Sequence, residues 1–199
     1  MMLLLSLVLM LASIEMMSEI ASAMCHIAST GAVVEQYRER LSINGSTIAF
    51  SSPEWDMGQD LNGDGDTDDY VIRYYDISTG TLTNTGAVGD SPSISGSIIA
   101  FSTYEWWINQ DLNGDGYTDD SVIRYYDIST SILKSTGAVG DSPSIGGSII
   151  AFSTYEGNIG QDMNGDGDTY DVGIRHYDIS TGTLTNTDAI GDYPSITGS

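Results

Sequence analysis

The sequence repeats itself every 51 residues, and this period restricts the possible fold more than any other feature. Phe50, Phe101 and Phe152 each end the phrase Ile-Ala-Phe, and an acidic phrase and an Arg-Tyr/His-Tyr-Asp phrase recur at the same interval. A fixed period of this length is typical of proteins built from stacked supersecondary units. The repeats cover residues 41–90, 91–141 and 142–192, and a fourth begins at residue 193.

Each repeat reads as a series of short strands separated by turns. Residues 97–102 are a continuous small and apolar run, which predicts a strand buried on both faces. Residues 122–128 alternate and are rich in β-branched and aromatic side chains, which predicts a half-buried strand. Residues 81–85 read as a polar outer strand, and Pro92 within residues 91–94 suits a sheet edge.

Four short strands per repeat, graded from apolar to polar, are the pattern of a β-propeller blade. We therefore predict an all-β chain of about three four-stranded antiparallel sheets, one for each 51-residue repeat. Because propeller rings typically have about four to eight blades, the ring is predicted to be incomplete in this chain. The interrupted fourth repeat, residues 193–199, leaves a blade edge open, which predicts self-association through that edge.

Two phrases of the repeat resemble a known family. Residues 92–102 read Pro-Ser-Ile-Ser-Gly-Ser-Ile-Ile-Ala-Phe-Ser, and residues 72–80 read Ile-Arg-Tyr-Tyr-Asp-Ile-Ser-Thr-Gly. Together they resemble the TolB-like β-propeller repeat, over residues 41–199. With the inserted acidic phrase, the repeat looks most like the calcium-loop type found in surface proteins of methanogenic archaea. The resemblance implies an extracellular propeller.

The N-terminal residues read as an export signal. Residues 3–14 are an apolar run that is short for a membrane span, and Ala-Ser-Ala ending at residue 23 offers a small-residue cleavage site. We predict a signal peptide over residues 1–23, an extracellular or cell-surface location, and no membrane span after cleavage. No Lys or Arg precedes the run, so a mis-assigned start or an amphipathic helix is the alternative. Residues 24–40 are predicted to include part of an outer strand.

The charge balance argues against several classes of partner. The chain has 28 acidic and 6 basic residues, for a formal net charge of −22. Nucleic-acid binding and docking on an anionic membrane both need a basic surface, so neither is predicted.

The counts of cysteine and histidine exclude further kinds of site. Cys25 is the only cysteine, which excludes an intrachain disulfide, and two histidines argue against zinc sites. No catalytic set emerges, so we predict that the chain is not an enzyme.

Each repeat contains one acidic loop with the ligand spacing of a calcium site. Oxygen-bearing side chains occupy positions 1, 3 and 5 counted from Asp60, and Gly65 at position 6 permits a sharp turn. Calcium takes about six to eight hard oxygen ligands, which this spacing folds around one centre. We predict Ca²⁺ sites in the first two loops, with the third loop as a further candidate. The predicted metal ligands are Asp60, Asn62, Asp64, Asp66 and Asp68; Asp111, Asn113, Asp115, Tyr117 through its backbone carbonyl, and Asp119; and Asp162, Asn164, Asp166, Asp168 and Asp171.

These loops differ from an EF-hand. Position 12 holds Val or Gly instead of Glu, and strands rather than helices are predicted on either side. Position 9 of the third loop is Tyr170, so Asp171 is predicted in its place; whether Asp69 and Asp120 also bind is left open. The alternative is a solvated acidic turn. Against it, the closely spaced carboxylates of the first loop repel one another unless a cation neutralises them.

Other residues also recur or stand out. An Arg and a Glu appear once in each repeat: Arg73, Arg124 and Arg175 with Glu54, Glu105 and Glu156. We interpret them as an ion pair within each blade that orients the acidic loop; a ligand site around the propeller axis is the alternative. The tryptophans at positions 55, 106 and 107 either bind a sugar or protein partner or cover the blade edge.

We interpret the chain as an exported, calcium-stabilised β-propeller scaffold for binding or adhesion at the cell surface, with a protein or glycan as partner. Binding specificity is expected in the variable phrase before each acidic loop, because loops on a constant framework carry function. Two alternatives stay open. The first is a structural component of a surface lattice or filament, and the second is the propeller part of a larger extracellular enzyme.

Overall fold

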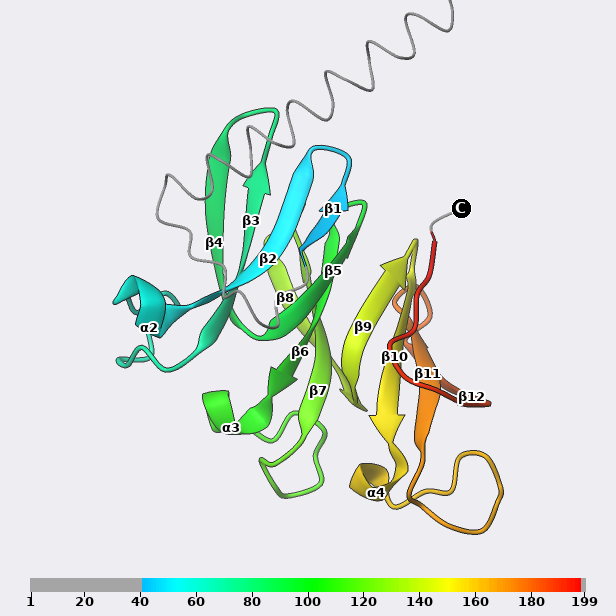
Figure 1. The fold of residues 1–199 in the computed structure, drawn as a ribbon. Helices are drawn as coiled ribbons and strands as arrows, with labels where there is room; N and C mark the ends of the chain where they lie inside the picture. Colours follow the sequence, from blue (N-terminus) through cyan, green and yellow to red (C-terminus); the bar gives the residue numbers. More distant parts are fainter. Residues whose placement is uncertain (1–40, 198–199) are drawn as a thin grey trace, which may run out of the picture.

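The computed structural model describes residues 41–197, which form three antiparallel sheets of four strands each. The sheets follow one another along the chain and lie side by side as open, unclosed blades (Figure 1). In each sheet the strands are ordered as in the sequence. The predicted all-β architecture of propeller blades is therefore confirmed. The predicted signal peptide and residues 24–40 lie outside the described residues.

The elements repeat with the sequence. The strands are β1 (Ser42–Asn44), β2 (Thr47–Pro53), β3 (Tyr70–Asp76) and β4 (Thr81–Val88); β5 (Asp90–Ser95), β6 (Ile98–Tyr104), β7 (Ser121–Asp127) and β8 (Ile132–Val139); and β9 (Asp141–Gly146), β10 (Ile149–Tyr155), β11 (Val172–Asp178) and β12 (Thr183–Ile190). One turn of helix follows the second strand of each sheet: α2 (Glu54–Met57), α3 (Glu105–Ile108) and α4 (Glu156–Ile159). Each acidic loop therefore joins a short helix to the third strand of its sheet. No helix in the described part of the chain is both long enough and apolar enough to cross a membrane.

The second strand of each sheet is the most deeply buried. In β6 every residue between Ile98 and Tyr104 is buried, as the continuous small and apolar run predicts. The outer strands β4 and β8 begin exposed and become buried at their final Ala-Val pair. The sequence gradient from apolar to polar matches this placement, because the apolar second strands are buried and the polar outer strands β4 and β8 begin at the solvent.

Apolar side chains join neighbouring blades. Ala49, Ile72 and Ala87 of the first blade form one buried cluster with Ile99 and Phe101 of the second, together with Ile94 and Tyr126. The equivalent cluster joins the second blade to the third and contains Phe152 in the place of Phe101. These two clusters lie between blades, and their burial stabilises the arrangement of the blades. A third buried cluster, of Ile48, Phe50 and Tyr75, lies within the first blade.

Serines on the innermost strands connect the blades by hydrogen bonds. The backbone N–H of Ile94 donates to Ser42 Oγ at 2.9 Å, and the N–H of Ile145 donates to Ser93 Oγ at 3.1 Å. The N–H of Ile196 donates to Ser144 Oγ at 3.0 Å, so the chain after β12 lies against β9 in the same way. Each of these bonds satisfies a backbone donor that a short edge strand leaves without a partner in its own sheet.

The chain crosses from one blade to the next through a glycine. At Gly140 a Cβ atom would lie 2.5 Å from Phe152 Cδ2 and 2.6 Å from the backbone oxygen of Ser153. Gly89 makes the equivalent close approach to Phe101 and Ser102. Only glycine allows the backbone to pass so close to the buried ring.

The outer face of the third blade differs from those of the other two. Ile190 at the end of β12 is 49% exposed, whereas the equivalent Val88 and Val139 are 4% and 6% exposed. Val88 and Val139 each precede a crossing to a following sheet, and among the described residues no sheet follows β12. The third blade therefore leaves uncovered the positions that its neighbours bury.

Candidate metal sites

The first residue of each short helix is a glutamate whose side chain is fully buried. The backbone N–H of Glu54 donates to the carbonyl oxygen of Asp69 at 2.9 Å, which joins the start of α2 to the residue before β3. Glu54 Oε1 accepts the backbone N–H groups of Leu61 and Asn62, the latter at 3.1 Å. Glu105 holds the second loop in the same way. Each glutamate therefore fixes the beginning of an acidic loop against the end of its sheet.

The loop itself is shaped by hydrogen bonds from aspartate side chains to the backbone. Asp60 accepts the N–H groups of Gly63 at 2.6 Å and Gly65 at 3.0 Å. Asn62 and Asp64 each accept the N–H two residues further along the chain. The other two loops repeat these bonds. The acidic phrase therefore folds into the tight loop that its spacing predicts.

Carboxylates from three parts of the blade converge beside this loop. One oxygen from each of Glu54, Asp66 and Asp69 lies within 4.8 Å of the other two. Asn62 Nδ2 donates to Asp69 Oδ2 at 2.7 Å, which holds Asp69 in place. Glu54 and Asp69 are buried and Asp66 is exposed, so the cluster opens to solvent on one side only.

The third loop has an equivalent cluster. Carboxylate oxygens of Glu156, Asp168 and Asp171 also lie within 4.8 Å of one another. In the second loop Tyr117 occupies the position of Asp66 and is 69% exposed, so only Glu105 and Asp120 are present there. Among the described residues, the clusters of three acids therefore form in the first and third repeats. Both clusters can hold a metal ion, because they gather hard oxygen donors at one point.

Two of the buried glutamates retain an unused oxygen. Glu54 Oε2 and Glu105 Oε2 are inaccessible to solvent and have no hydrogen-bond partner. Glu156 Oε2 accepts a long bond of 3.4 Å from the N–H of Asp171. A buried carboxylate without a compensating partner is unfavourable. A cation in the cluster would supply that partner.

Only some of the metal ligands predicted from the loop spacing belong to these clusters. Asp66, Asp168 and Asp171 belong to them, whereas Asp68 and Asp119 at position 9 are exposed and lie outside. Position 10, Asp69 in the first loop, is buried instead. The structure brings Asp69, which the loop spacing left open as a ligand, together with Glu54. The sequence had suggested Glu54 as a partner of Arg73 and not as a candidate metal ligand. The signal was an acid six residues before the first aspartate of every loop.

The predicted ion pair between the recurring Arg and Glu is wrong for the described residues. Arg73 lies opposite Phe50 in the sheet, and its Nη1 donates to Met57 Sδ at 3.4 Å. The Nε atoms of Arg73 and of its two counterparts are buried without a hydrogen-bond partner. Glu54 begins a helix that turns its side chain toward the acidic loop, so recurrence at one spacing did not mean contact.

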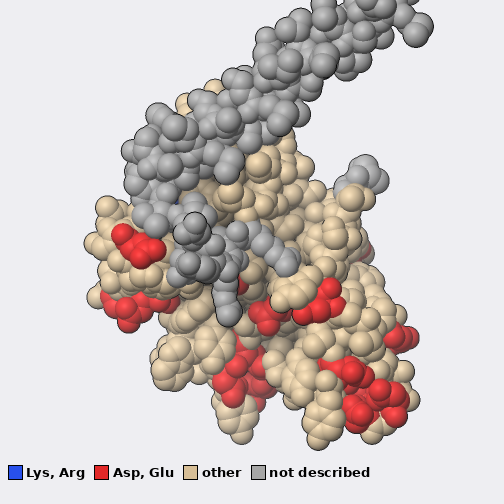
Figure 2. Space-filling view, in the orientation of Figure 1, with Lys and Arg blue, Asp and Glu red and all other residues tan. Residues whose placement is uncertain are grey.

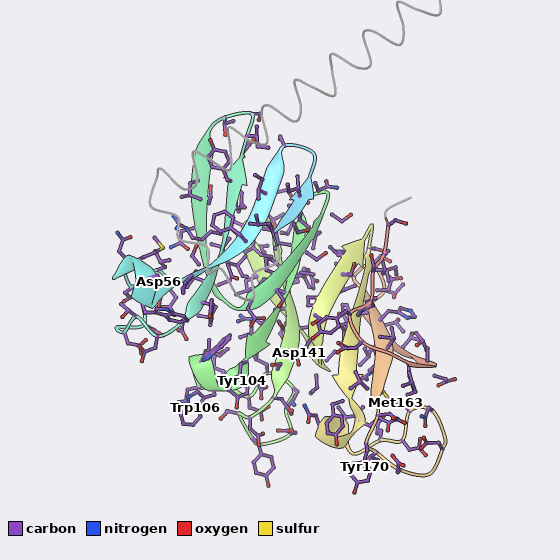
Figure 3. All side chains as sticks on the ribbon, in the orientation of Figure 1. Asp56, Tyr104, Trp106, Asp141, Met163 and Tyr170 are labelled. Carbon is purple, nitrogen blue, oxygen red and sulfur yellow. The ribbon has the colours of Figure 1, made fainter. Side chains whose placement is uncertain are left out.

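The tryptophans before the first two loops separate into two groups. Trp55 contacts Tyr70 edge to face with ring centroids 4.7 Å apart, and Tyr70 lies 5.7 Å from Trp107. Trp107 in turn lies 5.9 Å from Tyr104, so these rings form a ladder between the first two blades. Trp106 is 70% exposed and projects outward from α3 (Figure 3). Trp107 therefore packs within the ladder, while Trp106 is available to a partner.

Acidic side chains on the visible face gather around the loops that follow α2, α3 and α4 (Figure 2).

The surroundings of one aspartate in each loop raise its pKa. Burial, reinforced by the nearby charges of Asp64 and Glu54, raises the pKa of Asp69 to about 7. Burial beside Asp115 raises the pKa of Asp120 to about 6. Burial also raises the pKa of Asp171. Each loop therefore contains a carboxyl group whose ionisation is disfavoured by burial and by nearby acidic groups.

The raised pKa values predict how the metal-free chain responds to pH. Aspartates of the unfolded chain have a pKa of about 3.9, so between about pH 4 and 7 the folded chain binds more protons than the unfolded chain. The stability of the metal-free chain should therefore fall as the pH rises through this window and level off above it. Thermal melts in chelator at several pH values measure this slope. Asp69→Asn should reduce it, and a stability that rises between pH 5 and 7 would contradict the assignment.

Comparison with known proteins identifies similar folds only. No known family and no curated protein matches the sequence. The solved structures with similar folds include TolB from Acinetobacter baumannii, with 18% identity over 71% of this chain and a TM-score of 0.42. The tricorn protease has 15% identity over 77% and a TM-score of 0.47. The β-propeller domain of the Trilobed protease from Pyrococcus furiosus has 12% identity over 77% and a TM-score of 0.49. The chain spans 29%, 13% and 45% of these three structures.

Proposed function

We propose that this chain belongs to an exported β-propeller whose blades are stabilised by calcium and which acts as a binding or adhesion scaffold at the cell surface. The calcium assignment is carried by the convergence of buried Glu54 and Asp69 with Asp66. These donors are all oxygen atoms, which favours Ca²⁺ or Mg²⁺ over metals that prefer nitrogen or sulfur. Magnesium retains its own water molecules rather than enter such a cluster, so calcium fits better. The relation to calcium-loop repeats of archaeal surface proteins is part of this proposal.

The proposed role of the ion is structural. Extracellular calcium modules bind with dissociation constants of about 10⁻⁴–10⁻³ M, near the calcium concentration outside cells. An ion with that affinity is bound for much of the time and reports little about changes in concentration. In each blade it would join the end of the second strand, the acidic loop and the start of the third strand.

The binding role is proposed for the loop end of the blades. Trp106 is exposed there, and exposed aromatic side chains are enriched at binding surfaces. The phrase that contains it differs between repeats, while the strands around it stay constant. A protein or a glycan is the proposed partner, and no catalytic activity is proposed for this part of the protein.

The second candidate function is a component of a surface lattice or filament. In such an assembly, blades of different chains would pack as the blades around Val88 and Val139 pack within this chain. Open-ended assembly by light scattering would support the lattice, whereas a discrete particle would support the scaffold.

Equilibrium dialysis with radioactive calcium tests the calcium assignment. At free calcium well above the millimolar range, the chain is expected to bind one ion per repeat. Asp66→Ala removes a clustered carboxylate from the first site and Asp168→Ala removes one from the third, so each variant should bind one ion fewer. Asp56→Ala removes an exposed acid outside the loops and should bind as many ions as the original chain. Unchanged binding by both loop variants would refute the loop sites.

A further inference from the structure

The glutamate at the start of each short helix brings a charged side chain into the interior of its blade. Glu54, Glu105 and Glu156 are each fully inaccessible to solvent. One oxygen of Glu54 accepts two backbone N–H groups, and the other is buried without any partner. Glu105 has the same arrangement. A glutamine would make the same backbone bonds without bringing a charge into the blade, so the charge itself needs an explanation.

The surroundings of Glu54 increase this cost. Its nearest charged neighbours in the cluster are Asp66 and Asp69, both of the same sign. Arg73 does not neutralise them, because its guanidinium donates to Met57 instead. A buried anion that faces two further anions is stabilised either by a cation between them or by protonation of one carboxyl group. Above the raised pKa of Asp69, a cation is the remaining means of compensation.

We propose that Glu54, Glu105 and Glu156 are direct ligands of the metal ion in their blades, and that the ion lies between the acidic loop and the end of the sheet. This inference rests on the proposed calcium function. In an EF-hand the glutamate at position 12 closes the coordination shell with two oxygens. Here position 12 is Val71, Val122 or Gly173 at the start of the third strand. In this proposal, the glutamate six residues before the first aspartate of the loop replaces the position-12 ligand. The buried aspartate at position 10 supplies a further ligand.

This arrangement predicts an order of calcium affinity among the three sites. The first and third repeats offer a third carboxylate, Asp66 and Asp168, whereas the second offers Tyr117. Affinity for calcium rises with the number of charged ligands. The first and third sites should therefore bind calcium more tightly than the second. The spacing alone had placed the second loop ahead of the third.

The variant Glu54→Gln tests the inference. Its amide oxygen still accepts the N–H groups of Leu61 and Asn62, so the loop keeps its support while one charged ligand is lost. Calcium titration followed by calorimetry should show the affinity of one site reduced at least about tenfold, since even residues behind the ligands cost about 10–100-fold. The melting temperature in chelator should stay the same or rise, because an unpaired buried charge is removed. Asp56→Asn, an exposed acid on the same helix, is the matched control and should change neither value.

The outcomes separate this inference from the proposed function. If the original chain binds no calcium, the proposed function fails and this inference fails with it. If the original chain binds one ion per repeat and Glu54→Gln binds them with unchanged affinity, the glutamate only supports the loop and this inference alone is overturned. If Glu54→Gln does not fold, Glu156→Gln provides the same test in the third repeat. Loss of folding in chelator for both variants would mean that the glutamate is required without metal and would also overturn the inference.

Discussion

Replacing Phe101 with alanine is expected to lower the free energy of unfolding by about 3–5 kcal/mol. The ring is fully buried on β6 and belongs to the cluster that joins the first two blades, with Ala49, Ile72 and Ala87 on the opposite side. The backbone at Gly89 passes directly over it. Neighbours held by two different sheets cannot collapse fully into the space, so the substitution costs both lost burial and a cavity.

Urea denaturation in the presence of calcium measures this effect. The control is Trp106→Ala, which removes an aromatic ring of larger size from the surface and should change stability by no more than about 0.5 kcal/mol. A loss below about 1 kcal/mol for Phe101→Ala would show that the blades are not joined through this cluster. A large loss for both variants would contradict the exposed position of Trp106.

The blade architecture could be predicted from the sequence because the same strand pattern occurs three times. The run at residues 97–102 corresponds to β6, and the alternating run at residues 122–128 corresponds to β7, each displaced by one or two residues. Pro92 lies in β5 at a sheet edge, as a residue without an N–H donor requires. Agreement between repeats removes the ambiguity that a single short apolar run would have.

The composition of the acidic clusters could not be predicted in the same way. Loop numbering favoured position 9, but the chain enters β3 with Asp69 inward and Asp68 outward. The recurring Glu54 and Arg73 suggested a pair, yet one begins a helix that faces the loop and the other lies on the strand opposite Phe50. Residues that recur in every repeat occupy equivalent positions in the blades, but their recurrence does not predict which side chains are in contact. The direction of each side chain depends on where the strand ends and the helix begins.

Removal of calcium is expected to have an effect comparable to the loss of Phe101. At about 10⁻³ M calcium, a site with a dissociation constant of about 10⁻⁴–10⁻³ M contributes about 0.4–1.4 kcal/mol by mass action. One site per repeat then contributes about 1–4 kcal/mol in total, against a typical domain stability of about 5–15 kcal/mol. For a chain of this size that corresponds to roughly 3–15 °C in melting temperature. The repulsion among Glu54, Asp66 and Asp69 would become uncompensated when the ion leaves.

The most direct test is a thermal melt of the chain at fixed ionic strength, first with calcium, then with chelator, and with magnesium as the control for general screening of charge. If calcium stabilises the blades, the melting temperature will be roughly 3–15 °C higher in calcium than in chelator, with a much smaller rise in magnesium. Equal melting temperatures in calcium and chelator, or an equal rise in magnesium, would contradict calcium-stabilised blades and leave the acidic loops as solvated turns.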